Sequence, residues 1–239
     1  MEKQQLEAIL FDAVGTLIHL KAPVGKIYLE RAQRFGFEAS DRQIAAKLDA
    51  SFRTAFRRQG PLAFPTREAA EIPGLEREWW RSVVLGTFAS HGTIPYFNTF
   101  YEDLFEMFGT GEPWRLDQDA RAVLSAFKDR TVKIGLVTNY DSRVFNVLDN
   151  LGIRSFFDVI TISSQVGAAK PDPAIFAAAC EALSSTPALT CHIGDDPEED
   201  WEGAKRAGLK AILYDPDGRR AHLNAPRLSR LADLVPALL

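Results

Sequence analysis

The chain has few cysteines, no long hydrophobic run and no large excess of one charge. Its 239 residues contain two cysteines, Cys180 and Cys191, too few for a disulfide framework, which indicates two buried thiols in a reducing compartment. No segment approaches the roughly 20 apolar residues of a membrane span, and the first residues lack the apolar run of a signal peptide. We therefore expect a cytoplasmic protein with no membrane partner.

The charged residues also exclude some partners. They make up 25% of the chain, alternate in sign along it and give a formal net charge of −4. A nucleic-acid-binding protein concentrates lysine and arginine in one region, and no such region is present in this sequence. We expect no nucleic-acid partner, while a small anionic substrate remains compatible with local groups of positive charge. The pattern sets no oligomeric state.

Strands and helices alternate in the predicted order of elements. Short apolar runs bounded by polar residues predict buried strands, and apolar residues at helical spacing predict the segments between them. This alternation is typical of an α/β fold with a parallel sheet. The expected strands span residues 8–11, 132–138, 157–163, 189–193 and 210–214, and the expected helices span residues 117–128, 142–151, 173–183 and 197–207.

Residues 21–111 interrupt the alternation and predict a helical insertion. Apolar residues recur there at helical spacing in 27–35, 44–56, 75–88 and 96–108, while glycine and prolines in 59–73 predict a loop. The many aromatic residues of the insertion indicate a packed core more than a ligand site. We therefore divide the chain into an α/β domain, residues 1–20 and 112–239, and a helical domain, residues 21–111.

The ends of the predicted strands carry the first two candidate site segments. In an open parallel sheet, ligands bind beyond the carboxyl ends of the strands. Asp12 follows the first strand, where its carboxylate is a candidate nucleophile beside the turn at Gly15 and Thr16. Thr138 and Asn139 end the second strand before a helix, whose N-terminus is a natural anion site. Taken alone, each segment could equally be an ordinary turn or helix cap.

Two further segments add a lysine and a pair of acids. Lys170 precedes Asp172 and Pro173, which suit the first positions of a helix, so its ammonium is held at a rigid entrance where it can neutralise an aspartate or a phosphoryl oxygen. Asp196 suits the N-cap of the next helix. Asp195 is left to face the same crevice as Asp12, and two carboxylates meeting there require a proton or a cation. Oxygen ligands of this kind favour magnesium.

With the four segments in this order, the chain resembles the haloacid dehalogenase-like (HAD) hydrolases along its whole length. The first segment, Phe-Asp-Ala-Val-Gly-Thr-Leu, looks most like the capped, subfamily I type and its rhythmically-expressed-gene-related branch. The resemblance implies a doubly wound, Rossmann-like parallel sheet, with the helical insertion as a cap over the active site. It also implies a Mg²⁺ cofactor and a small phosphorylated substrate.

The resemblance assigns a role to each matching residue. Asp12 corresponds to the nucleophile and a metal ligand, and Lys170 to the lysine that neutralises charge. Phosphate binding is assigned to Gly15, Thr16, Thr138 and Asn139. The metal ligands implied are Asp12, the backbone carbonyl of Val14 and Asp195, with Asp196 or Asp200 supporting the metal through water or through bonds to its ligands.

Val14 is a departure from the family pattern, which usually has a second aspartate at this position. That aspartate protonates the leaving group and then activates the hydrolytic water. Losing a positioned general acid or base removes ~10²–10⁴ in rate, so alkyl phosphates should be poor substrates, and acyl and aryl phosphates should suffer less. We therefore expect a phosphohydrolase that is slow or selective.

Val14 also keeps three other functions open. A catalytically weakened protein could bind phosphate and a partner. A 2-haloacid dehalogenase also lacks the second aspartate, although dehalogenases resemble Ser-Ser-Asn where this chain has Gly194, Asp195 and Asp196. A phosphonate-cleaving relative would need a Schiff-base lysine in the cap, for which Lys26 and Lys47 are candidates only by position.

Other polar residues fit bland interpretations better than functional ones. Arg53, Arg57 and Arg58 could meet a second anionic group on the substrate, but their spacing is that of a solvated helix face. His192 lies within an apolar strand and indicates a hydrogen-bonded core residue. His19 follows the Gly-Thr turn and could approach the site.

Overall fold

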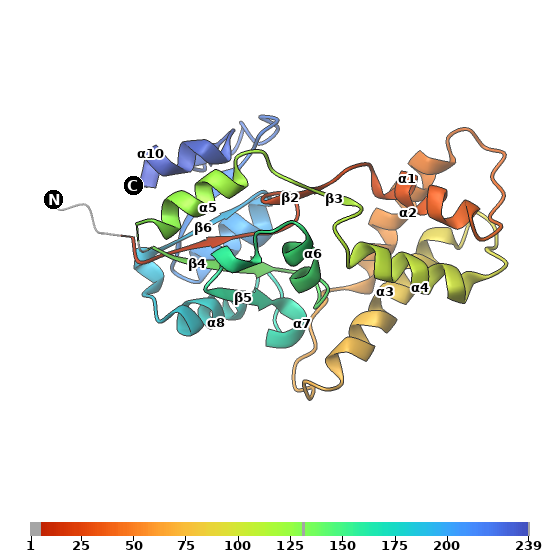
Figure 1. The fold of residues 1–239 in the computed structure, drawn as a ribbon, viewed down its shortest axis with the longest axis horizontal. Coiled ribbons are helices and arrows are strands. Elements are labelled where there is room, and N and C mark those ends of the chain that lie inside the picture. The colour runs from red at the N-terminus through yellow and green to blue at the C-terminus, as the bar shows by residue number, and fades with distance from the viewer. Residues whose placement is uncertain (1–5, 131, 239) are drawn as a thin grey trace.

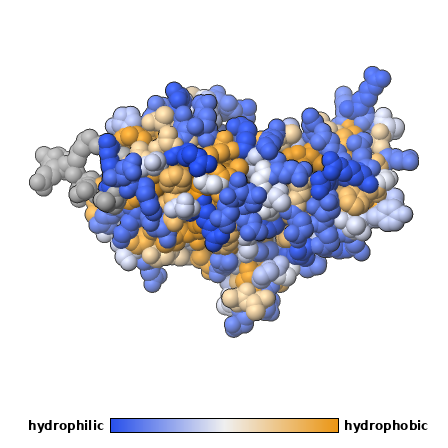
Figure 2. Space-filling view, in the orientation of Figure 1, coloured by the Kyte–Doolittle hydropathy of each residue, from blue (hydrophilic) through white to orange (hydrophobic). Residues whose placement is uncertain are grey.

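The computed structural model describes residues 6–130 and 132–238. Residues 1–5 and 239 lie outside these ranges. They include both ends of the expected α/β domain and part of the N-terminal segment that lacks the apolar run of a signal peptide. The described chain forms two lobes, a sheet with its helices and a purely helical lobe (Figure 1). Hydrophilic residues are spread over both lobes in the space-filling view (Figure 2).

A six-stranded parallel sheet forms the centre of the first lobe. Its order is β5-β4-β1-β6-β7-β8, and every neighbouring pair is parallel. β1 lies in the interior between β4 and β6, so the residues that follow these three strands emerge at one edge of the sheet. The strands are β1 (Ala8–Phe11), β4 (Lys133–Thr138), β5 (Val159–Ile162), β6 (Thr190–Gly194), β7 (Lys210–Tyr214) and β8 (Arg227–Leu228).

Helices cover both faces of the sheet. Successive side chains of a strand point to opposite faces, and β1 shows this with Ile9 and Phe11 in one buried cluster and Leu10 in another. The Ile9 cluster includes residues of α5 (Ala120–Lys128), α6 (Val144–Asn150) and α10 (Leu234–Leu238). The Leu10 cluster includes residues of α8 (Pro173–Leu183) and α9 (Gly203–Arg206). The predicted doubly wound α/β fold is confirmed.

The second lobe consists of four helices with a core of their own. They are α1 (Val24–Gln33), α2 (Ile44–Gln59), α3 (Ile72–Phe88) and α4 (Phe97–Phe108). Tyr28, Phe88 and Phe100 are buried in this core, and their rings pack against one another or against neighbouring phenylalanines. Most aromatic residues of the insertion therefore build the helical lobe, as their spacing predicts. We refer to this lobe as the cap.

The chain enters and leaves the cap through one pair of short strands. β2 (Ile18–Leu20) and β3 (Trp114–Leu116) are antiparallel. Just beyond them, the Lys21 backbone N–H donates to the Pro113 carbonyl at 2.9 Å. The strand pair lies next to the expected domain boundaries, although the sequence pattern did not predict the strands themselves.

Several short elements also differ from the expected ones. The segment expected as one helix over 197–207 consists of a π-helical turn, η3 (Pro197–Glu202), followed by α9. β5 is followed at once by α7 (Ser163–Val166), and 3-10 turns lie at Arg154–Phe156, Pro187–Leu189 and Leu231–Asp233. Within the described part of the chain, no helix is both long and apolar enough to cross a membrane.

Candidate active site

The carboxyl ends of β1, β4 and β6 bring the predicted catalytic residues together. Asp12 follows β1, Thr138 ends β4, and Asp195 follows β6. The Lys170 ammonium donates to Asp12 Oδ1 at 2.6 Å and to Asp200 Oδ1 at 2.6 Å, and all three side chains are buried. A buried lysine between two carboxylates is a fixed positive charge, suited to neutralising an attacking carboxylate or a phosphoryl oxygen.

Asn139 holds the segment that carries Lys170. Its Nδ2 donates to the Lys170 carbonyl at 2.9 Å, and its Oδ1 accepts from the Lys170 backbone N–H at 2.7 Å. Nδ2 also donates to Glu199 Oε2 at 3.0 Å. The side chain of Asn139 is thus occupied in positioning the lysine, and its assignment to phosphate binding stays a prediction.

Electrostatics keep the ammonium and one of its partners charged. Burial alone would lower the pKa of Lys170, but Asp12 and Asp200 raise it above its usual range. Burial alone would raise the pKa of Asp200, but Lys170 and His192 hold it below its usual range. His192 Nε2 lies 2.8 Å from Asp200 Oδ1 and is fully buried, as expected for a hydrogen-bonded core histidine.

Three carboxylates form a group that suits a divalent cation. Asp12, Asp195 and Asp200 each place one oxygen within 4.8 Å of the others. Asp12 Oδ2 is buried without a hydrogen-bond partner among the described residues. Burial raises the pKa of Asp12 to about 7, and burial together with Asp200 raises the pKa of Asp195 to about 6. A cation with oxygen ligands would relieve both the repulsion and the missing partner, so the residues fit magnesium.

The backbone at Gly15 brings Asp195 close to the first turn. Gly15 has a φ of 103°, and a Cβ built on it would lie 2.3 Å from Asp195 Oδ1. A side chain at this position would therefore displace the carboxylate from the acidic group. Thr16 lies beside this turn and its hydroxyl is buried without a partner among the described residues. The roles of Gly15 and Thr16 in phosphate binding stay predictions.

Asp196 and Asp200 have different positions, which the sequence could not rank. Asp196 Oδ1 accepts from the backbone N–H groups of Glu198 and Glu199, so this carboxylate is the N-cap of η3. Asp200 lies in the acidic group, and its Oδ2 accepts from the Asp196 backbone N–H at 3.0 Å. Of the two, Asp200 belongs to the group that fits a metal, while support of the metal by Asp196 stays a prediction, as does ligation by the Val14 carbonyl.

A cavity of about 280 Å³ lies between the sheet lobe and the cap and reaches the catalytic group. Asp12, Thr138 and Lys170 line one part of it, and Val14 lines it as well, with 38% of its surface exposed. Nine of the twenty lining residues are aromatic, and four carry charge. The charged lining residues are Asp12, Arg143, Lys170 and Glu199. The active site is therefore a polar floor under a largely aromatic enclosure.

Glu199 adds a fourth acid beside the site. It lines the cavity and accepts the hydrogen bond from Asn139. Burial raises the pKa of Glu199 to about 7. From the sequence, this residue is expected to be an acid that interacts favourably with a helix N-terminus. Its position in the first turn of a helix does not predict the contact with Asn139.

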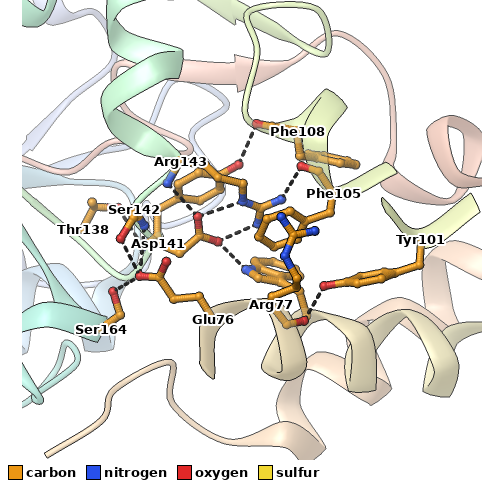
Figure 3. Close-up of polar contacts among 12 residues, drawn as sticks. Glu76, Arg77, Tyr101, Phe105, Phe108, Thr138, Asp141, Ser142, Arg143 and Ser164 are labelled. Carbon is orange, nitrogen blue, oxygen red and sulfur yellow. Dashed lines mark hydrogen bonds and ion pairs between the residues drawn. The ribbon is translucent and has the colours of Figure 1, made fainter. Parts of the chain in front are cut away.

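A buried polar network joins the cap to the sheet lobe (Figure 3). Glu76 of α3 accepts from the Ser142 backbone N–H at 3.1 Å, from the Ser142 hydroxyl at 2.8 Å and from the Ser164 hydroxyl at 2.5 Å. Burial raises the pKa of Glu76. The partners are at least 66 residues away along the chain, so no local pattern in the sequence could indicate this contact.

Arg143 is the centre of the second half of that network (Figure 3). Its Nε and Nη2 donate to the two oxygens of Asp141 at 2.8 and 2.6 Å, and its Nη1 donates to the Phe105 carbonyl at 2.8 Å. The guanidinium carbon lies 3.8 Å from the centroid of the Phe105 ring. Trp80 of the cap donates from its indole N–H to Asp141. These contacts fix the enclosure relative to Asp12 and Thr138.

The cap residues considered from the sequence have ordinary surroundings. Lys26 lies 3.8 Å from Glu30, Lys47 donates to Asp41, and Arg53 donates to Asp49. None of them lines the cavity, and neither do Arg57 and Arg58. His19 Nε2 lies 3.4 Å from Asp117 Oδ2 and is also outside the cavity lining. Cys180 and Cys191 are free and buried, as predicted.

Comparison with known proteins identifies the family of the chain. Residues 6–208 match the family model of haloacid dehalogenase-like hydrolases. The haloacid dehalogenase-like hydrolase domain-containing protein 3 of Mus musculus is 31% identical, over 98% of this chain and 94% of the relative. The Rhythmically expressed gene 2 protein of Drosophila melanogaster is 30% identical, over 86% and 81%. The phosphoserine phosphatase of Thermus thermophilus is 29% identical, over 96% of each chain.

A solved structure shares the fold. The HAD phosphatase from Thermococcus onnurineus superposes with a TM-score of 0.69 over 98% of each chain, at 22% identity. The resemblance that the four strand-end segments suggested is thus confirmed by the family model, by relatives that match nearly the whole chain and by the shared fold. The chain belongs to the haloacid dehalogenase-like hydrolase family and is a hydrolase.

Proposed function

We propose that the protein is a magnesium-dependent phosphohydrolase that acts on a small phosphorylated metabolite through an aspartyl-phosphate intermediate. The observation that carries this proposal is the geometry of Asp12. One of its oxygens is bound to the buried ammonium of Lys170, and the other has no partner among the described residues, at a cavity that Thr138 also lines. The similarity to a phosphoserine phosphatase supports phosphate chemistry.

In the proposed first step, the carboxylate of Asp12 attacks the phosphorus atom. A bond forms between the carboxylate oxygen and phosphorus, the bond from phosphorus to the leaving oxygen breaks, and the leaving group keeps the electron pair. Lys170 offsets negative charge on the phosphoryl oxygens, and the hydroxyl of Thr138, which lines the cavity, donates to one of them. Water then cleaves the aspartyl-phosphate, which releases phosphate and restores the carboxylate.

Asp12 and Asp195 would hold the magnesium ion, with Asp200 beside them. The ion would neutralise the crowded carboxylates and the phosphoryl oxygens. Asp200 keeps its bonds to Lys170 and His192 and so orients the lysine. The cap closes over the site and excludes bulk water.

Val14 makes the proposed enzyme selective. It lines the cavity beside Asp12 but has no titratable group, so it can neither protonate a leaving oxygen nor activate water. Substrates whose leaving oxygen departs without a proton should therefore be favoured.

The proposal is tested by phosphate release from acetyl phosphate, an aryl phosphate and a panel of sugar phosphates, each with magnesium and with a chelator. Asp12→Asn is the blank, because an amide is a poor nucleophile in the same space, and Lys170→Ala should also remove turnover. We expect release that needs magnesium and is lost in both variants.

Release that persists in Asp12→Asn would reject the aspartyl-phosphate mechanism. No release from any substrate would favour a phosphate-binding protein that keeps the site without turnover. Halide release from 2-haloacids in the same assay would instead indicate a dehalogenase.

A further inference from the structure

We infer that the substrate is a phosphate monoester of an uncharged aromatic alcohol, in which the aryl ring occupies the cap side of the cavity. The inference rests on the proposed phosphohydrolase function and adds the chemical class of the leaving group. Three observations carry it: the composition of the cap wall, the state of the charged groups around the cavity, and Val14 beside the nucleophile.

The wall that the cap contributes to the cavity is apolar. None of the cap residues that line it is charged. The indole N–H of Trp80 is bound to Asp141, and the Tyr101 hydroxyl is bound to the Arg77 carbonyl, so neither offers a free donor. The Tyr28 hydroxyl, which has no hydrogen-bond partner among the described residues, is the one side-chain polar group of this wall that stays free for a substrate. The cap rings that line the cavity belong to Tyr28, Phe52, Phe56, Trp80, Tyr101, Phe105 and Phe108.

Such a wall disfavours substrates with many polar groups. A sugar phosphate would bury several hydroxyls against it, and an amino-acid phosphate would bury an ammonium and a carboxylate. Buried polar groups without partners lose the hydrogen bonds that they make in water. An aromatic ring loses nothing of this kind and packs against the wall through edge and face contacts.

The two positively charged residues that line the cavity are both paired with acids of the protein, and Glu199 accepts a hydrogen bond from Asn139 on one of its oxygens. Lys170 is bound to Asp12 and Asp200. The guanidinium of Arg143 donates to Asp141 and to the Phe105 carbonyl. The positive charge that remains useful is thus the ammonium at the phosphoryl site, and the rest of the substrate meets rings.

The size of the cavity suits a small aryl phosphate. A cavity of about 280 Å³ exceeds the roughly 150 Å³ that is known to hold one benzene molecule. One ring, or two fused rings, together with the phosphoryl group fit this space. A bulky macromolecular substrate does not.

Val14 selects for the same class of leaving group. When Asp12 attacks phosphorus, the bond to the aryl oxygen breaks and the electron pair departs on that oxygen as a phenolate. A phenol has a pKa of about 10, far below that of an alkyl alcohol, so the phenolate can leave unprotonated and take its proton from solvent afterwards. The cap and the turn after β1 thus favour one substrate class for independent reasons.

The test compares kcat/KM for three esters with wild-type protein and magnesium. 4-Methylphenyl phosphate is the expected class. Phosphotyrosine has the same ring and leaving oxygen but adds an ammonium and a carboxylate, and cyclohexyl phosphate has similar size but an alkyl leaving oxygen. We expect 4-methylphenyl phosphate to exceed phosphotyrosine by at least about 10-fold and cyclohexyl phosphate by at least about 100-fold.

A pair of cap variants tests the wall itself. Phe56 lines the cavity and is 37% exposed, so a charge at this position can stay solvated. Phe56→Glu should lower the ratio of kcat/KM for 4-methylphenyl phosphate to that for acetyl phosphate by about 10-fold. Tyr96→Glu is the matched control, since Tyr96 is 68% exposed on the cap and outside the cavity, and it should leave the ratio unchanged.

Acetyl phosphate separates failure of this inference from failure of the proposed function. It needs neither an aromatic wall nor a proton donor, so its magnesium-dependent hydrolysis reports the phosphohydrolase alone. Hydrolysis of acetyl phosphate with no preference among the three esters, or an unchanged ratio in Phe56→Glu, would overturn the aryl inference only. Absence of all hydrolysis would overturn both.

Discussion

Single residues set both the chemistry and the stability of the site, and Val14 is the most informative of them. Its position in the turn after β1 places it at the cavity, beside the carboxylate of Asp12. The residue type was readable from the sequence, as was its chemical meaning, because proton transfer needs a titratable group. What the sequence could not show is the aromatic enclosure above it, since most of the lining rings come from α1 to α4, Trp114 and Tyr140 come from the sheet lobe side, and all of them meet only in the folded chain.

Replacement of Val14 by aspartate should therefore restore a proton donor. We expect Val14→Asp to raise kcat/KM for alkyl phosphates such as cyclohexyl phosphate by about 100-fold, and to raise that for acetyl phosphate much less. Steady-state phosphate release measures both. Val14→Leu is the control for a change of size without a titratable group. An equal gain in the leucine variant would show that shape, and not proton transfer, limits the wild type.

Glu76 gives a second prediction at the residue scale. Its Oε1 accepts three hydrogen bonds from Ser142 and Ser164. Glu76→Gln can keep these bonds, whereas Glu76→Ala leaves the donors unpaired in a buried place. We expect the alanine variant to lower the free energy of unfolding by about 2 kcal/mol or more and the glutamine variant to lower it far less, measured by urea denaturation.

The pH dependence of stability in the wild type and in Glu76→Gln tests whether burial of Glu76 raises the pKa of its carboxyl group. Burial raises the pKa of Glu76 above 4.5, so the folded state binds the proton more tightly than the unfolded state. The stabilising effect of the protonated form is complete below pH 4.5 and is lost as the pH rises through the folded-state pKa. The wild type should therefore lose stability relative to Glu76→Gln over this interval. A difference that does not vary with pH would show that Glu76 is not destabilised by burial.

At the scale of elements, the buried strands at the centre of the parallel sheet were predictable, and the two strands that connect the sheet lobe to the cap were not. The apolar runs before Asp12 and before Asp215 gave β1 and β7 with the observed bounds, and the following polar residues marked the edge of the sheet. β2 and β3 have three residues each and depend on each other for their hydrogen bonds. Their partner lies far along the chain, so neither has a local signal.

The segment after β6 shows the same limit. Pro197 and the acids after it predicted a helix start, and Asp196 does cap it. The π-helical turn that follows brings the Asp200 carboxylate back toward Gly194, where a Cβ would lie 2.1 Å from Asp200 Cγ. This return depends on the fit between two backbones and not on the periodicity of apolar residues. A regular helix was the natural expectation.

The N-cap residue of η3 can be compared with the N-cap residue of α8. Asp196 accepts from two backbone N–H groups of η3, and Asp172 accepts from the Ala174 N–H at 2.9 Å. Removing either side chain with Asp→Ala should cost about 1 kcal/mol in the free energy of unfolding. Asp196→Ala should also lower kcat, because η3 carries Asp200 and its bond to Lys170, and Asp172→Ala, at the helix that follows Lys170, should lower kcat less. Equal kcat values in the two variants would deny η3 any role in positioning the lysine.

At the scale of the whole molecule, metal binding should be visible as stability. A ligand that binds only the folded state raises the free energy of unfolding by about 2.7 kcal/mol at 100 times its dissociation constant. Magnesium should raise the Tm of the wild type and not that of Asp195→Asn, measured by calorimetry without substrate. If Asp195→Asn loses the magnesium-dependent rise in Tm but keeps its activity, the catalytic metal is bound at another site.

A pair of glycine variants separates backbone strain from blockage of the site. Gly15 and Gly218 both have positive φ, at 103° and 67°, but a Cβ on Gly15 meets Asp195 whereas a Cβ on Gly218 meets nothing within 4 Å. Both alanine variants should lose some stability. Gly15→Ala should also lose the magnesium shift, and Gly218→Ala should keep it. A magnesium shift retained in Gly15→Ala would show that Asp195 can move without loss of the ion.

The connection between the two lobes has an evolutionary consequence. Lys21 and Pro113 are joined by a backbone hydrogen bond where the chain leaves the sheet lobe and returns to it. Because departure and return lie side by side, the whole cap can be exchanged as a cassette without changing the order or register of the parallel strands. Descendants of one ancestral hydrolase could in this way acquire different substrates while they inherit the same catalytic residues.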